Sequence, residues 1–295
     1  MKDKKTIYYN NDFSQDFVSQ GKNIRIIDEN YKYEHKNIFW KIARFIIYRI
    51  FVTPIAFFYC KFNLRLKVAN KKALKECKKT GYFIYGNHTH QYSDPFSPNI
   101  ICFPKKVDMV VHPYNVSIKF LGKITPFLGA LPLPSNLKGS RNFLKAMSNN
   151  IKKKHCIIIY PEAHIWPYFT KIRPYASTSF KYPIQFNSPS FCFTTTYQQK
   201  KHSKKPKVTI FVDGPFYPDK SLILKEQQED LKNKIYSTMC ERSKNSTYEY
   251  YNYVLTEDKN NAIEENIKKE DNATNITNNN KDKNNNNNNE TTLKQ

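Results

Sequence analysis

The chain of 295 residues carries 48 lysine and arginine residues against 25 aspartate and glutamate residues, so its formal net charge is +23. This length can bury a substantial core, and an aromatic content of 15% argues against a wholly disordered polypeptide. With only 7 glycines and 6 cysteines, a collagen-like chain and a disulfide-dense scaffold are excluded. The charge predicts an anionic partner: nucleic acid, an anionic membrane surface, or a phosphorylated or acidic ligand.

Residues 1–36 are predicted to be a polar N-terminal extension, because they are rich in Tyr, Asn and Lys and show no sustained hydrophobic period. The extension lacks the apolar stretch of a signal peptide. Across the whole chain, no two cysteines are closer than 17 residues, so there is no C-x-x-C pair, and most have apolar neighbours. These features predict free, buried thiols in an intracellular protein.

Residues 37–66 are predicted to form a membrane-associating helical segment. The apolar run at 38–62 resembles a membrane span, but three cations interrupt its first half and Pro54 breaks its second half. On a helical wheel, Lys41, Arg44 and Arg49 share one face, and apolar residues fill the remainder. We expect a helix lying in the membrane interface with its cations toward lipid phosphates. An ordinary amphipathic helix packed on the core, with solvated cations, is the alternative.

Residues 67–253 are predicted to form an α/β domain with a mixed, largely parallel sheet flanked by helices. Its β-prone runs lie at 82–85, 107–111, 156–160, 191–197 and 208–212. Its helical periods lie at 140–154 and 221–241. Residues 254–295 are Asn-rich and include a run from Asn284 to Asn289, which predicts a disordered tail.

The densest polar segment is Gly-Asn-His-Thr-His-Gln-Tyr-Ser-Asp-Pro-Phe at 86–96, directly after the predicted strand 82–85. Loops at the carboxyl ends of strands build active sites in α/β sheets. A histidine beside a carboxylate can act as a general base, because the acid holds its tautomer and stabilises the imidazolium. His88 or His90, with Asp94, could therefore activate a substrate hydroxyl. The alternative is a polar loop in which Asp94 caps a helix.

A second polar cluster, Pro-Glu-Ala-His at 161–164, follows the predicted strand 156–160. Glu162 lies where a site residue is expected, and the downstream cations Lys171 and Arg173 could meet a phosphate. A surface salt bridge and a solvated face are the alternative interpretation. Between the two clusters, Gly129 belongs to a Gly/Pro-rich turn that could bound a site or an acyl groove.

The order of these motifs resembles that of the glycerolipid acyltransferases, most closely the lysophosphatidic acid acyltransferases. Asn-His…Asp follows a strand at 87–94, Gly-x-x-Pro-Leu-Pro follows at 129–134, and Tyr-Pro-Glu follows another strand at 160–162. The resemblance spans roughly residues 82–215. It implies a glycerol-3-phosphate acyltransferase-like fold with His88 as the base, Asp94 as its orienting partner and Glu162 at the acceptor. The other residues expected to bind substrate are Asn87, Gly129, Arg141, Lys171 and Arg173.

The chain departs from the family's pattern at the histidine motif. Five residues separate His88 from Asp94, where the family usually has four. His90 is a rival base, because His90 and Asp94 lie four residues apart and would share a helix face. We favour His88 because it follows Asn87, as the family's histidine follows an asparagine.

Two further departures concern the acceptor. Ala163 replaces the glycine of the family's Pro-Glu-Gly motif, and Ser135 stands where the family has an arginine. The second change puts the site of the acceptor's phosphate in doubt. The candidate replacements are Lys138 with Arg141, or Lys171 with Arg173.

The resemblance thus implies a membrane-associated O-acyltransferase. It would move a fatty acyl group from acyl-CoA or an acyl carrier protein to a lysophospholipid hydroxyl, with lysophosphatidic acid converted to phosphatidic acid as the expected reaction. No metal or other cofactor is expected. The expected location is the cytoplasmic face of the cell membrane, as a peripheral or monotopic protein on an anionic surface. A non-catalytic lipid-binding protein is the alternative, and a nucleic-acid-binding protein is less favoured because no RNP1-like, KH-like or zinc pattern appears.

Overall fold

The computed structural model describes residues 4–10, 15–17, 24–201 and 203–256, and it divides into two units. In the smaller unit, strands β1 (Thr6–Tyr9) and β9 (Asn252–Leu255) pair in parallel. The larger unit, residues 16–251, contains the sheet and the long N-terminal helix. Of the predicted Asn-rich tail, residues 254 and 255 belong to β9, and the part from 257 onward lies outside the described residues.

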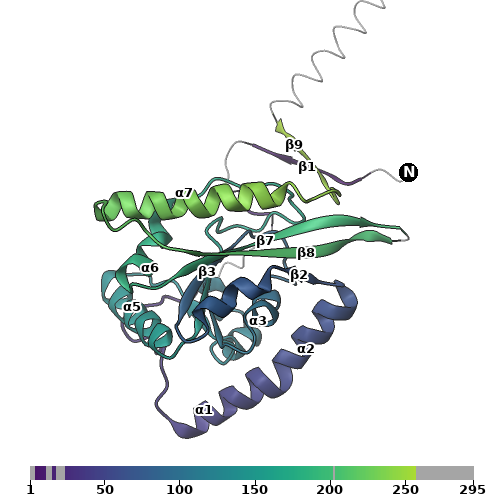
Figure 1. The fold of residues 1–295 in the computed structure, drawn as a ribbon. Helices are drawn as coiled ribbons and strands as arrows, with labels where there is room; N and C mark the ends of the chain where they lie inside the picture. The colour runs from purple at the N-terminus through teal and green to yellow at the C-terminus, as the bar shows by residue number, and fades with distance from the viewer. Residues whose placement is uncertain (1–3, 11–14, 18–23, 202, 257–295) are drawn as a thin grey trace, which may run out of the picture. The chain divides into compact units, whose positions relative to one another are not determined.

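A seven-stranded sheet in the order β2-β8-β7-β3-β6-β4-β5 forms the centre of the larger unit. Every neighbouring pair is parallel except β7 and β8, which form an antiparallel hairpin (Figure 1). The prediction of a mixed, largely parallel sheet is therefore confirmed. The strands are β2 (Lys67–Ala69), β3 (Tyr82–Gly86), β4 (Val107–Val111), β5 (Ala130–Pro132), β6 (Cys156–Ile159), β7 (Ser190–Lys200) and β8 (Ser203–Phe216).

Helices cover both faces of this sheet. One face packs against α5 (Leu137–Lys152), α6 (Lys181–Gln185) and α7 (Leu224–Ser243). The other packs against the 3-10 helix η3 (Lys71–Cys77), α3 (Ser97–Cys102) and the end of the long N-terminal helix. Shorter helical turns are η4 (Pro113–Val116), α4 (Leu121–Ile124) and η5 (Ser177–Phe180).

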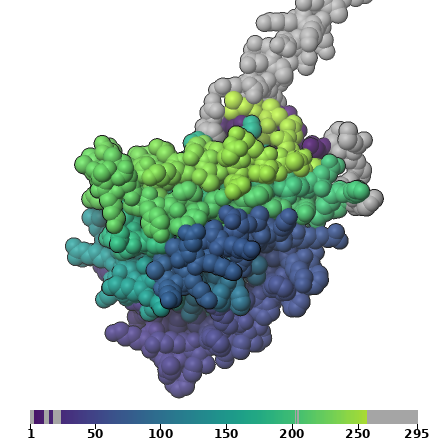
Figure 2. All heavy atoms as spheres, in the orientation of Figure 1, coloured from purple at the N-terminus to yellow at the C-terminus, as the bar shows by residue number. Residues whose placement is uncertain are grey.

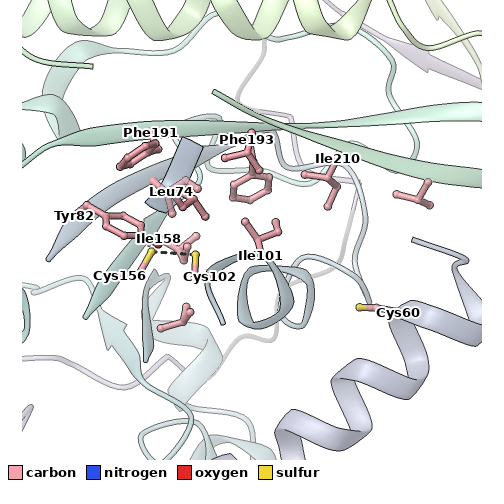
Figure 3. Close-up of a cluster of buried hydrophobic side chains, with 14 of the residues drawn as sticks. Cys60, Leu74, Tyr82, Ile101, Cys102, Cys156, Ile158, Phe191, Phe193 and Ile210 are labelled. Carbon is pink, nitrogen blue, oxygen red and sulfur yellow. Dashed lines mark hydrogen bonds between the residues drawn. The ribbon is translucent and has the colours of Figure 1, made fainter. Parts of the chain in front are cut away.

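Strand periodicity explains the two cores. In β3, Tyr82 and Ile84 belong to one hydrophobic cluster, whereas Phe83 and Tyr85 belong to the other. Successive side chains of a strand point to opposite faces, so a strand covered on both faces is apolar throughout. Figure 3 shows the first cluster, in which the Cys102 and Cys156 sulfur atoms lie 3.3 Å apart. All six cysteines are free and five are buried, as predicted.

The long N-terminal helix runs continuously from Ile38 to Asn63, and by length and composition it is the one helix of the described chain that could cross a membrane. It comprises α1 (Ile38–Phe45), the π-helical segment η1 (Ile46–Val52), α2 (Thr53–Phe58) and the π-helical segment η2 (Tyr59–Asn63). Its 26 residues span about 39 Å at 1.5 Å per residue.

Of the three cations expected to face lipid, Arg44 and Arg49 instead face the protein, and this corrects the expected orientation. Arg44 pairs with the buried carboxylate of Asp108 at 2.7 Å. Arg49 donates to the carbonyl oxygen of Pro104 at 2.7 Å. Large apolar side chains are exposed instead; they are Ile38, Phe39, Ile42, Phe45, Ile46, Ile50, Phe51, Ile55, Phe57, Phe58 and Phe62. Figure 2 shows this helix, in purple and blue, at the lower surface of the molecule in that view.

Candidate active site

The loop that carries His88 leaves the carboxyl end of β3 and is anchored to β7. A Cβ on Gly86 would lie 2.2 Å from the Phe193 ring, so only glycine lets that ring pack beneath the loop. Asn87 is completely buried, and its side chain makes two hydrogen bonds to the backbone of Thr195, at 2.8 and 3.1 Å. Asn87 therefore holds the loop in place, and its side-chain amide is occupied by the backbone of Thr195 rather than exposed, as a substrate-binding group would be.

His88 and Asp94 form a close pair. His88 Nδ1 lies 2.7 Å from Asp94 Oδ2; the side chain of His88 is 17% exposed and that of Asp94 only 1%. The Tyr160 ring stacks on the imidazole with ring centroids 4.4 Å apart, and its hydroxyl donates to the backbone oxygen of Asp94 at 2.8 Å. With Nδ1 as the donor to the carboxylate, Nε2 is left as the basic nitrogen of His88.

His90 uses its polar groups to hold the turn that leads to Asp94. Its Nδ1 accepts the Ser93 N–H at 3.1 Å, and its own backbone N–H donates to Asp94 Oδ2 at 3.0 Å. Burial lowers the pKa of His90, which keeps the imidazole neutral at neutral pH. The turn beginning at His90 accommodates the additional residue of the motif while Asp94 still reaches His88. The geometry therefore favours His88 over His90 as the base.

Glu162 and Arg173 form a buried ion pair beneath this loop. Glu162 Oε2 accepts the backbone N–H of His88 at 3.0 Å and a guanidinium N–H of Arg173 at 3.1 Å, while Oε1 accepts the backbone N–H of Arg173 at 3.1 Å. Arg173 also donates to the carbonyl oxygen of His164, and its guanidinium lies 5.0 Å from the centroid of the Trp166 ring.

This arrangement gives both charged residues a different position from the one expected. The Arg173 side chain is 1% exposed, so it stabilises Glu162 and is not presented to a phosphate. Glu162 contacts the backbone of His88 and is likewise buried. The two loops are joined further by hydrogen bonds from the backbone N–H of Trp166 to His88 O and from that of Tyr168 to Thr89 O, at 3.1 and 2.7 Å.

The structure does not bring Gly129 to the His88 loop. Gly129 has a φ of +91°, and a Cβ there would lie 2.5 Å from the Val107 oxygen, so glycine is needed in the tight turn that precedes β5, beside the amino end of β4. His88 lies beyond the carboxyl end of β3, so the two residues lie at opposite ends of the parallel strands. Lys171 and Arg141 are both exposed, the latter on α5. Their substrate contacts remain predictions.

A second histidine–aspartate pair, which sequence reasoning missed, lies at the amino ends of strands β4 and β6. His155 Nδ1 is 2.5 Å from Asp108 Oδ2, and Arg44 binds the other oxygen of the same carboxylate. Burial alone would raise the pKa of Asp108, but His155 and Arg44 hold it below its usual value. This cluster fastens the long helix to β4. The placement of His155 directly before a predicted strand was the available signal, but nothing in the sequence showed that its partner would be Asp108.

Among the described residues, no group of three or more His, Cys, Asp or Glu side chains is arranged to hold a metal ion.

No family model matches the sequence, and no curated protein matches it. Among solved structures, the 1-acyl-sn-glycerophosphate acyltransferase PlsC from Thermotoga maritima is similar, with 12% sequence identity and a TM-score of 0.48 over 71% of this chain and 89% of that chain. The function proposed below rests on the motifs and geometry of the site.

Proposed function

We propose that this chain is an O-acyltransferase in which His88 acts as the general base. The observation that carries the proposal is the 2.7 Å contact between His88 Nδ1 and the buried Asp94, which leaves the second ring nitrogen to take a proton. The order of the Asn-His…Asp, Gly-x-x-Pro-Leu-Pro and Tyr-Pro-Glu motifs, which resembles that of the glycerolipid acyltransferases, supports acyl transfer as the reaction.

In the proposed reaction, His88 Nε2 takes the proton from an acceptor hydroxyl as the hydroxyl oxygen attacks a thioester carbonyl carbon. The tetrahedral intermediate then breaks its C–S bond, and the leaving thiolate receives the proton from the imidazolium. The products are an ester and a free thiol. Asp94 stabilises the imidazolium during this cycle. Glu162 and Arg173 act as positioning residues, because their contacts hold the backbone of His88.

The proposed acceptor is a lysophospholipid, with lysophosphatidic acid to phosphatidic acid as the first reaction to test. The proposed donor is acyl-CoA or an acyl carrier protein. A net charge of +23 favours all of these partners, because each carries phosphate groups or acidic residues.

The activity is tested by incubating the full-length chain in mixed micelles with an isotope-labelled acyl donor and a panel of lysophospholipids. The expected result is a labelled diacyl product whose formation requires one acceptor class. Lipid binding without product for any donor and acceptor would favour the non-catalytic lipid-binding alternative, and the absence of both would contradict the proposal.

The proposed location is a membrane surface, on which the Ile38–Asn63 helix lies as a monotopic anchor. Its cationic face contacts the protein through Arg44 and Arg49, and its apolar side chains are exposed. Burying an exposed Phe side chain in lipid contributes about 1.5–3 kcal/mol. This orientation, with cations toward the protein and apolar side chains outward, supports direct contact between the helix and acyl chains.

The double variant Phe39→Glu, Phe58→Glu is expected to lower partitioning into vesicles at least tenfold, because it removes two apolar groups, 77% and 58% exposed, and adds charge. Flotation with phosphatidylcholine/phosphatidylglycerol vesicles measures this. Leu224→Glu, an equally apolar and exposed position on α7 across the sheet, is the control and should float like the wild type. Equal losses in both proteins would contradict a specific role for the long helix.

A further inference from the structure

A cavity of about 310 Å³ opens beside the His88 loop and has no role in the reaction described above. It lies where three parts of the larger unit meet: the end of the long helix, the turn after His88, and strand β8. Its polar side chains include Tyr59, His90, Tyr92, Tyr168 and Lys205. None of the residues that line it is acidic.

Each of these polar side chains carries a hydrogen-bond donor. The three phenols and the Lys205 ammonium are donors, and His90 joins them because its Nδ1 accepts from Ser93 and its proton is therefore on Nε2. His90 is only 5% exposed, so this donor is part of the buried wall. A concave site with several donors, one fixed positive charge and no carboxylate is suited to a phosphate group.

The surrounding charge agrees with this chemistry. Burial and the nearby cations Arg65 and Lys205 lower the pKa of Lys200, which places three positive groups near one another at this end of the β7–β8 hairpin. Burial, together with the neighbouring phenols, raises the pKa of Tyr168 to about 12, so its hydroxyl keeps its proton at neutral pH.

The cavity is also coupled to the reacting histidine. The backbone N–H of His90 and the Nδ1 of His88 bind the same oxygen of Asp94, and Tyr168 donates its backbone N–H to Thr89. A ligand bound against His90 and Tyr168 therefore contacts the loops that hold the base. The cation expected from sequence to meet a phosphate, Arg173, is instead buried against Glu162.

We propose that this cavity binds a phosphate ester of one of the two substrates, which rests on the acyltransferase function proposed above. The phosphate belongs either to the headgroup of the acceptor lysophospholipid or to the nucleotide end of a CoA thioester. In either case the tyrosine hydroxyls, His90 Nε2 and Lys205 donate to the phosphate oxygens.

Calorimetric titration of the full-length chain with sn-glycerol 3-phosphate and with adenosine 3′,5′-bisphosphate tests this site without requiring turnover. The wild type is expected to bind one of the two probes, and that probe identifies the source of the phosphate. We expect Lys205→Gln to raise the Kd for this probe at least fivefold and Tyr92→Phe to raise it about threefold. Both side chains are exposed at the cavity mouth, so neither change should disturb folding.

Lys220→Gln is the matched control, because it removes an exposed lysine outside the cavity, and its Kd should equal that of the wild type. Absence of binding for both probes, or equal weakening in Lys205→Gln and Lys220→Gln, would overturn the proposal. If acyl transfer is detected, Lys205→Gln should raise the KM for the same substrate at least fivefold with kcat within about twofold. Probe binding with no turnover would support this site while contradicting the proposed function.

Discussion

The Asp94→Asn variant is expected to transfer acyl groups about 10²–10⁴ times more slowly than the wild type. Asp94 Oδ2 holds His88 Nδ1 at 2.7 Å, and this requires the proton to be on Nδ1 and the lone pair on Nε2. An amide removes the negative charge that stabilises the imidazolium, and its N–H group can favour the other tautomer. Steady-state rates at saturating substrate measure the loss.

Asp213→Asn is the control for this experiment. Asp213 is also largely buried, but it pairs with Arg242, at 2.7 Å, and has no contact with His88 among the interactions of the described residues. Its rate per folded molecule should stay within about twofold of the wild type. An Asp94→Asn protein that retains more than a tenth of the wild-type rate would show that the carboxylate does not orient the base.

The Glu162→Ala variant is expected to lose about 3–5 kcal/mol of unfolding free energy. It leaves the Arg173 guanidinium, with its side chain 1% exposed, without its carboxylate, and it removes the acceptor of the His88 backbone N–H. Urea denaturation followed by circular dichroism measures the difference.

An exposed ion pair provides the comparison for Glu162. Asp230→Asn breaks the pair with Lys234 one helical turn away on α7, which should cost about 0.3–0.5 kcal/mol. If Glu162→Ala were no more destabilising than Asp230→Asn, the buried pair would not be a determinant of the loop's stability.

The central strands could be predicted from sequence because they are buried on both faces. The runs predicted at 82–85, 107–111 and 156–160 correspond to β3, β4 and β6. The sequence of β5 instead indicates a Gly/Pro turn, because Pro132 has no N–H to donate to a sheet ladder. Since β5 is an edge strand, it can contain this proline. The short edge strand β2 gave no periodic signal over three residues.

Partners far apart along the chain account for what the sequence could not predict. The helical wheel grouped Arg44 and Arg49 correctly on one face, but it could not tell whether that face meets lipid or protein. Arg44 turns inward because of Asp108, which lies 64 residues further along the chain. In the same way, local sequence suggests that Glu162 and Arg173 meet an acceptor or solvent, and only the fold shows that they pair with each other in the interior.

The fold also distinguishes the surroundings of His88 from those of His90. Spacing alone places both histidines near Asp94. In the structure, His90 directs Nδ1 to the Ser93 backbone, whereas His88 directs Nδ1 to the carboxylate. The asparagine before His88 proved to be a structural anchor, which explains why the histidine that follows it has a fixed position.

The most direct test of the account is acceptor-dependent thiol release from acyl-CoA in mixed micelles, comparing the wild type with His88→Ala and His90→Ala and including a blank without acceptor. We expect release by the wild type only with a lysophospholipid and a loss of about 10²–10⁴-fold in His88→Ala. His90→Ala should raise the KM and lose much less turnover than His88→Ala, because it removes the acceptor of the Ser93 N–H but leaves the His88 and Asp94 side chains in place. Undiminished release by His88→Ala, or no acceptor-dependent release by folded, lipid-bound wild type, would contradict the assignment of His88 as the base of an acyltransferase.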